Sequence, residues 1–291
     1  MAAHIAVASG KGGTGKTSIA TSLYRSISKD YADQVLLVDC DVEEPNDLLF
    51  FPESQRINQT TIYQEIPEID SKHCTFCRTC VEYCEFNAIL IIPTAEFAEV
   101  NASLCHSCGA CLTACPTGAF NIQNEAIGVI TNFKDEQGKE LLEGRLNIGS
   151  AKQTMVIRSL KQSIHSEKQL VILDAPPGTS CPVVETISDA DYVILVSEPT
   201  PFGLHDLKLM IALVRELGLS FGVVINKARL GNLDIYHYLK EEKVEILSEI
   251  PFNLSYASKY ARADLFTEIP AKVQDGHQEL ARKLSEKGLL P

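Results

Sequence analysis

The sequence predicts an α/β protein with a doubly wound, mostly parallel sheet and a smaller α+β insertion. Short apolar runs, typical of strands buried on both faces, alternate along most of the chain with segments of helical periodicity. This alternation stops between about Thr60 and Asn124, where the cysteines concentrate. Because alternating strands and helices favour a parallel sheet covered by helices, the interruption indicates a separate small domain.

The main domain is expected to be discontinuous, covering residues 1–59 and 125–291. Its first strand, at 4–8, enters a glycine-rich turn, and residues 17–27 then carry apolar side chains at helical spacing. Residues 125–160 are expected to form a β-hairpin and a connector. The other expected elements are strands at 35–39 and 170–174, the alternating runs YVILVSEPTP, GLHDLKLMIALVRELG, FGVVINK and VEILSEIPF, and a helix at 271–287.

The predicted inserted domain, residues 60–124, contains an internal repeat. A shift of 31 residues lays CTFCRTCVEYCEFNAI (74–89) over CHSCGACLTACPTGAF (105–120) and matches all four cysteines of each run. Ala88 also matches Ala119. A duplicated cysteine unit predicts a small pseudo-symmetric domain placed in a loop of the larger one.

Composition narrows the function classes. The 291 residues carry a net charge of −12, which repels nucleic acid and anionic lipid in the mean, so we expect neither a nucleic-acid nor a membrane partner. No export signal or membrane-spanning stretch is apparent, so we expect a cytoplasmic protein. In a reducing compartment ten cysteines, eight of them in tight spacing, indicate metal binding and not disulfides.

A phosphate-binding loop is predicted between the first strand and the first helix. Residues 10–17 satisfy the pattern G-x-x-x-x-G-K-S/T in the strand–loop–helix context that the mechanism requires. Lys16 should reach the β- and γ-phosphates of ATP, and Thr17 should ligate Mg²⁺. The residues expected to bind the nucleotide here are Gly10, Gly12, Gly13, Thr14, Gly15, Lys16 and Thr17.

The run KGGTGKT, which begins at Lys11, resembles the variant phosphate loop of the MinD, ParA, Mrp and nitrogenase iron protein group. The resemblance implies a P-loop NTPase domain that hydrolyses ATP as a homodimer. In that group the first lysine, here Lys11, reaches the nucleotide bound by the partner subunit. Such a cation would neutralise charge that develops during phosphoryl transfer and would tie hydrolysis to dimer closure. The alternative for Lys11 is a solvated loop lysine.

Acidic strand ends resemble the remaining parts of that group's site. Asp41 resembles the first switch residue near Mg²⁺ and the attacking water, with Asp39 in support, and Asp174 in DAPPGT resembles the Walker B aspartate. Carboxylates at the C-terminal ends of parallel strands lie where Mg²⁺ would need them, although such residues also cap strands. Asn226 in VVINK resembles the group's adenine-contacting asparagine. The expected catalytic residues are Lys11, Lys16, Asp41 and Asp174.

Each cysteine run has the spacing C-x2-C-x2-C-x3-C of bacterial ferredoxins that hold two 4Fe–4S clusters, which predicts a bacterial-ferredoxin-like insertion. In such ferredoxins the last cysteine of each run serves the other cluster. Two structural zinc ions are the alternative. The first run ends in Cys84-Glu85 in place of Cys-Pro, and this carboxylate should lower the potential of its cluster. The expected ligands are Cys74, Cys77, Cys80 and Cys115 for one cluster, and Cys105, Cys108, Cys111 and Cys84 for the other.

Two cysteines lie outside the runs. They are Cys40 and Cys181. The place of Cys181 resembles that of a cysteine that shares a cluster between two subunits in the nitrogenase iron protein, whereas that protein's second bridging cysteine has no clear counterpart in this chain. A buried cysteine is more commonly a small hydrophobic residue, so this is the favoured interpretation of both. The C-terminal C-x-x-C of Mrp-type carriers is missing from the chain.

Three functions remain open. The first is ATP-driven electron transfer through two 4Fe–4S clusters to an unidentified redox protein. The second is an assembly ATPase that delivers an iron–sulfur or metal cofactor to an accepting protein. The third is a MinD-like positioning ATPase with a redox sensor, which the tail QELARKLSEKGLLP disfavours because it lacks a strong apolar face.

Overall fold

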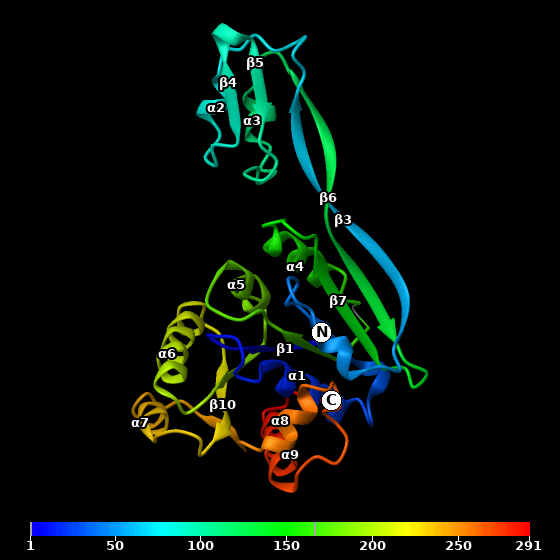
Figure 1. The fold of residues 1–291 in the computed structure, drawn as a ribbon, viewed down its shortest axis with the longest axis vertical. Coiled ribbons are helices and arrows are strands. Elements are labelled where there is room, and N and C mark those ends of the chain that lie inside the picture. Colours follow the sequence, from blue (N-terminus) through cyan, green and yellow to red (C-terminus); the bar gives the residue numbers. More distant parts are fainter. Residues whose placement is uncertain (1, 166) are drawn as a thin grey trace. The chain divides into compact units, whose positions relative to one another are not determined.

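The computed structural model describes residues 2–165 and 167–291, and the chain folds into two compact units. The large unit contains residues up to 60, 129–145 and 153–291; the small unit contains 61–128 and 146–152. Two long strands, β3 (Gln55–Ile69) and β6 (Phe120–Lys134), run from one unit into the other (Figure 1). Among the described helices, none is both long enough and apolar enough to cross a membrane.

The large unit is built on a mostly parallel sheet with the strand order β11-β10-β9-β1-β8-β2-β7-β6-β3. Strand β1 (Ala3–Ala8) lies between β8 (Leu170–Asp174) and β9 (Tyr192–Ser197), parallel to both. The predicted doubly wound parallel sheet is therefore confirmed. The remaining strands here are β2 (Val35–Asp39), β7 (Glu140–Leu146), β10 (Phe221–Ala228) and β11 (Ile246–Pro251).

Helices pack on this sheet through alternating side chains of the buried strands. Ile5 and Val7 of β1 share one apolar core with Ile19 and Leu23 of α1 and with Leu280 of the last helix. Since successive strand residues point to opposite faces, Ala6 and Ala8 are left for the other layer. The helices of this unit are α1 (Lys16–Ile27), α4 (Gln153–Gln162), α5 (Cys181–Ile187), α6 (Pro201–Glu216), α7 (Asp234–Glu241), α8 (Leu254–Tyr260) and α9 (Ala271–Glu286).

The hairpin predicted after the cysteine region forms between β6 and β7. Its turn is closed by the amide of Asp135, which donates to the carbonyl of Lys139 over 3.0 Å. The Asp135 carboxylate accepts from the amides of Gln137 and Lys139, and this stabilises the turn. Strand β7 then pairs with β2 in parallel, which brings the hairpin into the main sheet.

The small unit repeats its backbone as well as its sequence. Two short helices, α2 (Thr79–Glu82) and α3 (Ala110–Ala114), occupy equivalent places in the two runs, and β4 (Ile89–Ile92) pairs antiparallel with β5 (Phe97–Val100). Positive φ values recur at a spacing of 31 residues. The equivalent positions are Phe76 with Ser107, Arg78 with Gly109, and Asn87 with Gly118.

The bounds of the small unit differ from the expected insertion of 60–124. The small unit also contains residues 125–128, within β6, and residues 146–152, which begin at the end of β7. The chain therefore contributes two separate segments to this unit. Asn147 anchors the second segment, since its amide and side chain donate to the carbonyls of Ile127 and Ala126.

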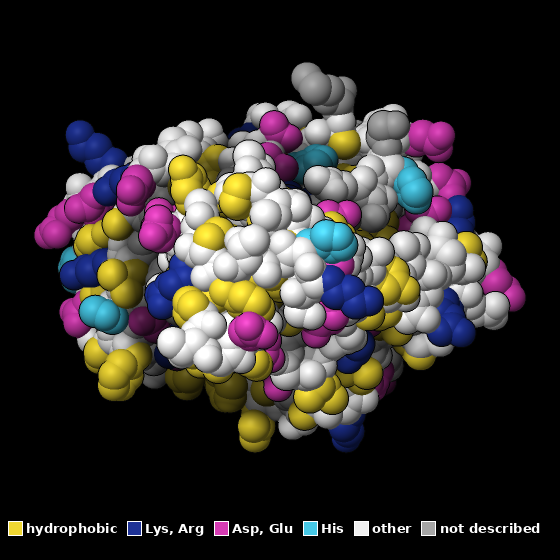
Figure 2. Space-filling model, turned by 90° about the horizontal axis from the view of Figure 1, so that it is seen from above, with side chains coloured by type: hydrophobic (Ala, Val, Ile, Leu, Met, Phe, Trp, Pro, Cys, Tyr) yellow, Lys and Arg dark blue, Asp and Glu magenta, His cyan; other side chains and the backbone are white. Residues whose placement is uncertain are grey.

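On the face drawn in Figure 2, Lys and Arg side chains are interspersed with Asp and Glu. Hydrophobic side chains are scattered among them on the same face. Side chains of both charges and apolar side chains are therefore mixed in this view.

Candidate nucleotide site and cysteine centres

The phosphate loop connects β1 to α1, and two of its glycines take a left-handed backbone. Gly13 has φ of 76° and Gly15 has φ of 93°. A Cβ atom at Gly15 would lie 2.1 Å from the side-chain nitrogen of Asn226, and one at Gly10 would lie 2.6 Å from the carbonyl oxygen of Asp206. Neither position has room for a side chain, so the glycines allow both the turn and the close packing beneath it.

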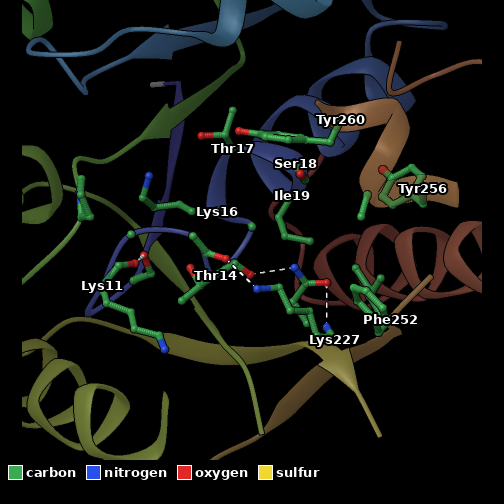
Figure 3. A pocket seen from close by; sticks show the side chains of 18 of the residues that line it. Lys11, Thr14, Lys16, Thr17, Ser18, Ile19, Lys227, Phe252, Tyr256 and Tyr260 are labelled. Atoms are coloured by element: carbon green, nitrogen blue, oxygen red, sulfur yellow. Dashed lines mark hydrogen bonds between the residues drawn. The ribbon is translucent and has the colours of Figure 1, made fainter. Parts of the chain in front are cut away.

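Two side chains from the end of β10 support the loop from below. Asn226 donates to the carbonyl of Thr14 over 2.7 Å, and Lys227 donates to the carbonyl of Gly13 over 2.8 Å (Figure 3). These bonds occupy loop carbonyls and leave the loop amides available for an anion. Asn226 thus contacts the loop, and its adenine contact remains a prediction. Lys227 was missed by the sequence analysis, where it was only the end of a strand.

The loop lines a cavity of about 350 Å³, the size of a small-ligand site. Buried within its lining, the hydroxyl of Thr14 has no hydrogen-bond partner among the described residues. An unpaired buried donor of this kind is what a bound phosphate oxygen would satisfy. The cavity is lined by residues of the loop and of α1, by Asp41, Glu44, Asn46 and Pro177, and by Asn226, Lys227, Ile250, Pro251, Phe252, Asn253, Tyr256, Ala257, Tyr260 and His277.

Asp174 receives both functional side chains at the start of α1. The hydroxyl of Thr17 donates to one carboxylate oxygen over 2.7 Å, and Lys16 Nζ lies 3.4 Å from the other. Asp174 ends β8 directly beside Asp39, which ends β2. The parallel register therefore brings the two predicted acidic strand ends to the same edge of the sheet, as their sequence positions indicated.

Lys16 is surrounded by four carboxylates that attract its charge: Asp174, Asp41, Asp47 and Asp39. Burial and the charge of Asp174 raise the pKa of Asp39 to about 8, although Asp39 accepts hydrogen bonds from the amides of residues 41, 46 and 47. Burial also raises the pKa of Asp41, to about 6. This concentration of acids around one lysine is suited to a divalent cation.

Asp47 is an acid near Lys16 that the sequence analysis missed. Its side chain is fully buried, and neither carboxylate oxygen has a hydrogen-bond partner among the described residues. Burial, then the charges of Asp39 and Asp174, raise its pKa well above the ordinary value. In the sequence Asp47 belongs to an ordinary acidic turn, so only the fold brings it to this site.

Mg²⁺ fits this set of donors. Among residues 2–165 and 167–291, no three His, Cys, Asp or Glu side chains converge as an all-protein metal site would require. Mg²⁺ beside a nucleotide does not need such a site, because it takes one or two protein ligands and completes its shell with phosphate oxygens and water. Thr17, with Asp41 and Asp174 beside it, has the chemistry that such a site uses.

In the small unit, one cavity is lined by Cys74, Cys77, Cys80 and Cys115. The first three belong to the first run and the fourth to the second run, which is the crossed grouping expected of a ferredoxin. The rest of the lining is mostly apolar and includes Ile69, Ile91 and Phe120. Burial raises the pKa of Cys80 to about 11. Among the neighbouring thiols, the charge of Cys115 contributes most to this rise.

Cysteines of both runs also meet at the second expected group. Cys84 of the first run and Cys105 of the second pack in one apolar cluster with Ile66 and Ala88. Backbone amides donate to sulfur at equivalent places in both runs: to Cys74 and Cys105 at 3.4 Å, and to Cys84 and Cys115 at 3.3 Å. Such N–H to sulfur bonds stabilise thiolates and tune iron–sulfur clusters.

The four cysteines expected for each cluster are the donor type of both a 4Fe–4S cluster and a structural zinc ion. In a 4Fe–4S cluster each cysteine binds a different iron atom, so the four sulfurs surround a larger object. One expected set of four, Cys74, Cys77, Cys80 and Cys115, lines a shared cavity in the structure.

A family model described as the CobQ/CobB/MinD/ParA nucleotide binding domain matches residues 5–266. The chain belongs to this family. It is 32% identical over 283 residues to the uncharacterized protein MJ0578 of Methanocaldococcus jannaschii, covering 97% of this chain and 96% of that protein. It is 26% identical to the uncharacterized ATP-binding protein MJ0823 of the same organism, over 84% and 83% of the two chains.

A solved structure shares the fold of the chain at low sequence identity. The septum site-determining protein MinD from Pyrococcus horikoshii, complexed with Mg-ADP, superposes with a TM-score of 0.57 at 16% identity. The match covers 99% of this chain and 98% of that chain. It supports the α/β P-loop architecture of this MinD/ParA-like protein.

Within this MinD/ParA-like ATPase, Lys11 is engaged by its own chain. Its Nζ lies 2.7 Å from Glu198, whose other carboxylate oxygen lies 2.8 Å from Lys227. Burial opposes ionisation of Glu198, but the hydrogen bonds from both lysines outweigh it and lower the pKa of that carboxyl. The sequence analysis missed Glu198, whose position after strand β9 carries no sign of its two partners.

The two remaining cysteines differ in exposure. Cys40 is fully buried, and burial raises the pKa of its thiol well above the ordinary value, as in an inert packing residue. Cys181 is exposed at the start of α5. The packing interpretation therefore suits Cys40 but not Cys181.

Proposed function

We propose that the protein is an ATP-hydrolysing iron–sulfur protein in which nucleotide-dependent closure of a homodimer is coupled to electron transfer. The observation that carries the proposal is the crossed cysteine group, where Cys115 shares a cavity with Cys74, Cys77 and Cys80. A second support is the phosphate loop of the same chain, where Thr17 and Lys16 both contact Asp174.

The ATPase half of the proposal follows from the geometry at the loop. Loop amides and Lys16 would bind the phosphates, and Thr17 with Asp41 and Asp174 would hold Mg²⁺ directly or through water. Attack of water on the γ-phosphorus breaks its bond to the bridging oxygen and yields ADP and phosphate. Lys11 of the partner subunit would stabilise the charge on the transferred group. Dimer closure would have to exchange the bond of Lys11 to Glu198 for one to the nucleotide.

The iron–sulfur half assigns one cluster to each crossed cysteine group. When bound, 4Fe–4S clusters supply one-electron transfer at low potential. The chain contributes four thiolates to each cluster, amide donors to the sulfurs and an apolar cover, and these tune the potential.

Chain continuity supports coupling between the halves. Helix α4 begins at Gln153, directly after the last residue of the small unit. Arg158 of α4 makes a two-bond ion pair with Glu185 of α5, at 3.0 and 2.8 Å. Helix α5 begins at Cys181, shortly after the Asp174 segment that would sense the γ-phosphate. A shift of this segment on hydrolysis would reach α4 through α5.

A second candidate function, delivery of a cluster to an accepting protein, is favoured by the exposure of Cys77 and Cys108. Each is one exposed ligand in an otherwise half-buried or buried group, and an exposed ligand is open to exchange. Incubation of the loaded protein with an apo-ferredoxin distinguishes the two functions. Retention of the clusters supports electron transfer, whereas their appearance on the acceptor supports delivery.

The deciding experiment measures iron, sulfide and nucleotide dependence together. Purified without oxygen, the chain should carry about eight irons and eight acid-labile sulfides. Cluster potentials would then be compared without nucleotide, with ADP and with a non-hydrolysable ATP analogue. A nucleotide-dependent shift supports coupling; zinc without sulfide would overturn the iron–sulfur proposal, and identical potentials would overturn the coupling.

A further inference from the structure

One buried lysine of the small unit has no acidic partner. Four lysines are buried among the described residues: Lys16, Lys152, Lys168 and Lys259. Three of them pair with a carboxylate, namely Asp174, Glu140 and Glu268 respectively. Lys152 is only 7% exposed, yet it forms no ion pair within the described part of the chain. A buried cation without a counter-charge is strongly unfavourable, so the site calls for an anion.

Lys152 lies against a predicted cluster ligand. Its Nζ donates to the carbonyl oxygens of Ser103, over 3.0 Å, and of Cys105. The Cys105 carbonyl also accepts from Gln64 Nε2 over 2.7 Å. The carbonyls orient the ammonium group, but they carry no net charge to balance it.

The internal repeat shows that this feature belongs to one cysteine group alone. The position equivalent to Cys105 in the first run is Cys74, whose carbonyl accepts no side-chain hydrogen bond within the ranges that the structure describes. The first group instead has two hydroxyls near sulfur: Thr79 at 3.4 Å from Cys77 and Thr117 at 3.6 Å from Cys115. Their equivalents in the second group are Ala110 and Phe86, which lack a hydroxyl.

We propose, resting on the iron–sulfur function above, that Lys152 is the counter-charge of the cluster held by Cys84, Cys105, Cys108 and Cys111. A cluster with four thiolate ligands is anionic, and reduction adds one more negative charge. A buried ammonium group beside it stabilises the reduced form and raises that cluster's potential. Lys152 is thus a positioning residue that sets the potential of one cluster.

The two clusters are consequently inequivalent. Hydrogen bonds from neutral hydroxyls are roughly half as strong as those that involve a charge, and exposure does not separate the groups, because each has one exposed cysteine, Cys77 or Cys108. Glu85 adds a negative charge next to Cys84, but it is exposed and largely screened. The buried cation therefore dominates, and the second cluster is the one reduced first.

The test is a redox titration of the anaerobic, cluster-loaded protein followed by electron paramagnetic resonance. Lys152→Met should lower one of the two potentials and leave the other unchanged, while Lys152→Arg should stay close to the wild type. Gln64→Glu would place a carboxylate at the same carbonyl, neutralise the cation in place and lower the same potential. Lys72→Met is the matched control, since Lys72 is exposed two residues before Cys74.

A Cys84→Ser background assigns the effect. In a protein that has lost the second cluster, Lys152→Met should leave the remaining potential unchanged. If Lys152→Met and Gln64→Glu left both potentials unchanged and lowered only the melting temperature, Lys152 would be a structural tether and the inference would be wrong. Wild-type protein without iron and sulfide would instead overturn the underlying function, so the two failures are distinguishable.

Discussion

Thr17 donates its hydroxyl hydrogen to Asp174 over 2.7 Å, joining the first turn of α1 to the end of β8. The two groups expected to face Mg²⁺ are thus held within hydrogen-bond distance by adjacent strands of the sheet. The Nζ atom of Lys16, the residue before Thr17 on the helix, lies 3.4 Å from the same carboxylate. The arrangement places the residues expected to bind metal and phosphate around one aspartate that is 1% exposed.

Loss of the Thr17 hydroxyl or of the Asp174 charge should change Mg²⁺-dependent ATP turnover more than it changes folding. We expect Thr17→Ala to raise the Mg²⁺ concentration for half-maximal ATP turnover roughly tenfold or more, and Asp174→Asn to reduce turnover by roughly two orders of magnitude. Turnover measured against Mg²⁺ concentration checks both values. Ser22→Ala is the control on the same helix, because Ser22 contacts Tyr256 and not Asp174. An unchanged Mg²⁺ dependence in Thr17→Ala would remove Thr17 from the metal site.

Lys11 should be released by a change at Glu198. Glu198→Gln removes the charge that holds both Lys11 and Lys227. A partly exposed pair of this kind contributes about 1 kcal/mol, so ATP-dependent dimerisation should strengthen roughly fivefold. Sedimentation with a non-hydrolysable ATP analogue, over a range of protein concentrations, measures the shift.

The double variant separates release from chemistry. Lys11→Ala should bind nucleotide normally yet lose turnover, and adding Glu198→Gln should not restore it, because the cation itself is missing. If Lys11→Ala hydrolysed ATP at the normal rate, the role across the dimer interface would be excluded.

Local patterns in the sequence were sufficient for the sheet and the phosphate loop. Apolar runs such as 170–174 and the glycines of residues 10–15 act through neighbours along the chain, so their pattern survives in the sequence. Glu198, Asp47 and Lys152 were missed because each acts on residues far away in sequence. Their positions look like ordinary surface charges until the fold brings them together.

Acid should destabilise the large unit through His277. Burial lowers the pKa of His277 to about 4; its Nδ1 has no partner among the described atoms, and its Nε2 lies 3.2 Å from the Tyr256 hydroxyl. The imidazole of His277 binds a proton below about pH 6.5 in the unfolded chain. In the folded chain it stays neutral down to about pH 4. Stability from this group is therefore complete above pH 6.5 and decreases as the pH falls to 4, by up to about 3 kcal/mol.

The measurement is urea unfolding followed by far-ultraviolet circular dichroism between pH 7 and pH 4. His277→Leu should flatten the pH dependence in that window, whereas His205→Leu, at a position on the surface of α6, should not. Equal slopes in the wild type and His277→Leu would show that the buried imidazole does not control acid stability.

Double cysteine variants distinguish crossed from uncrossed ligation. Cys74→Ser with Cys115→Ser removes two ligands of one crossed group, so the other group should keep about four irons. Cys105→Ser with Cys115→Ser removes one ligand from each group, so both clusters should be weakened or lost. Iron and sulfide analysis of the two variants gives opposite results if each run binds its own cluster. Because Cys115 shares a cavity with Cys74, Cys77 and Cys80, we expect crossed ligation, in which the Cys74→Ser, Cys115→Ser variant keeps about four irons.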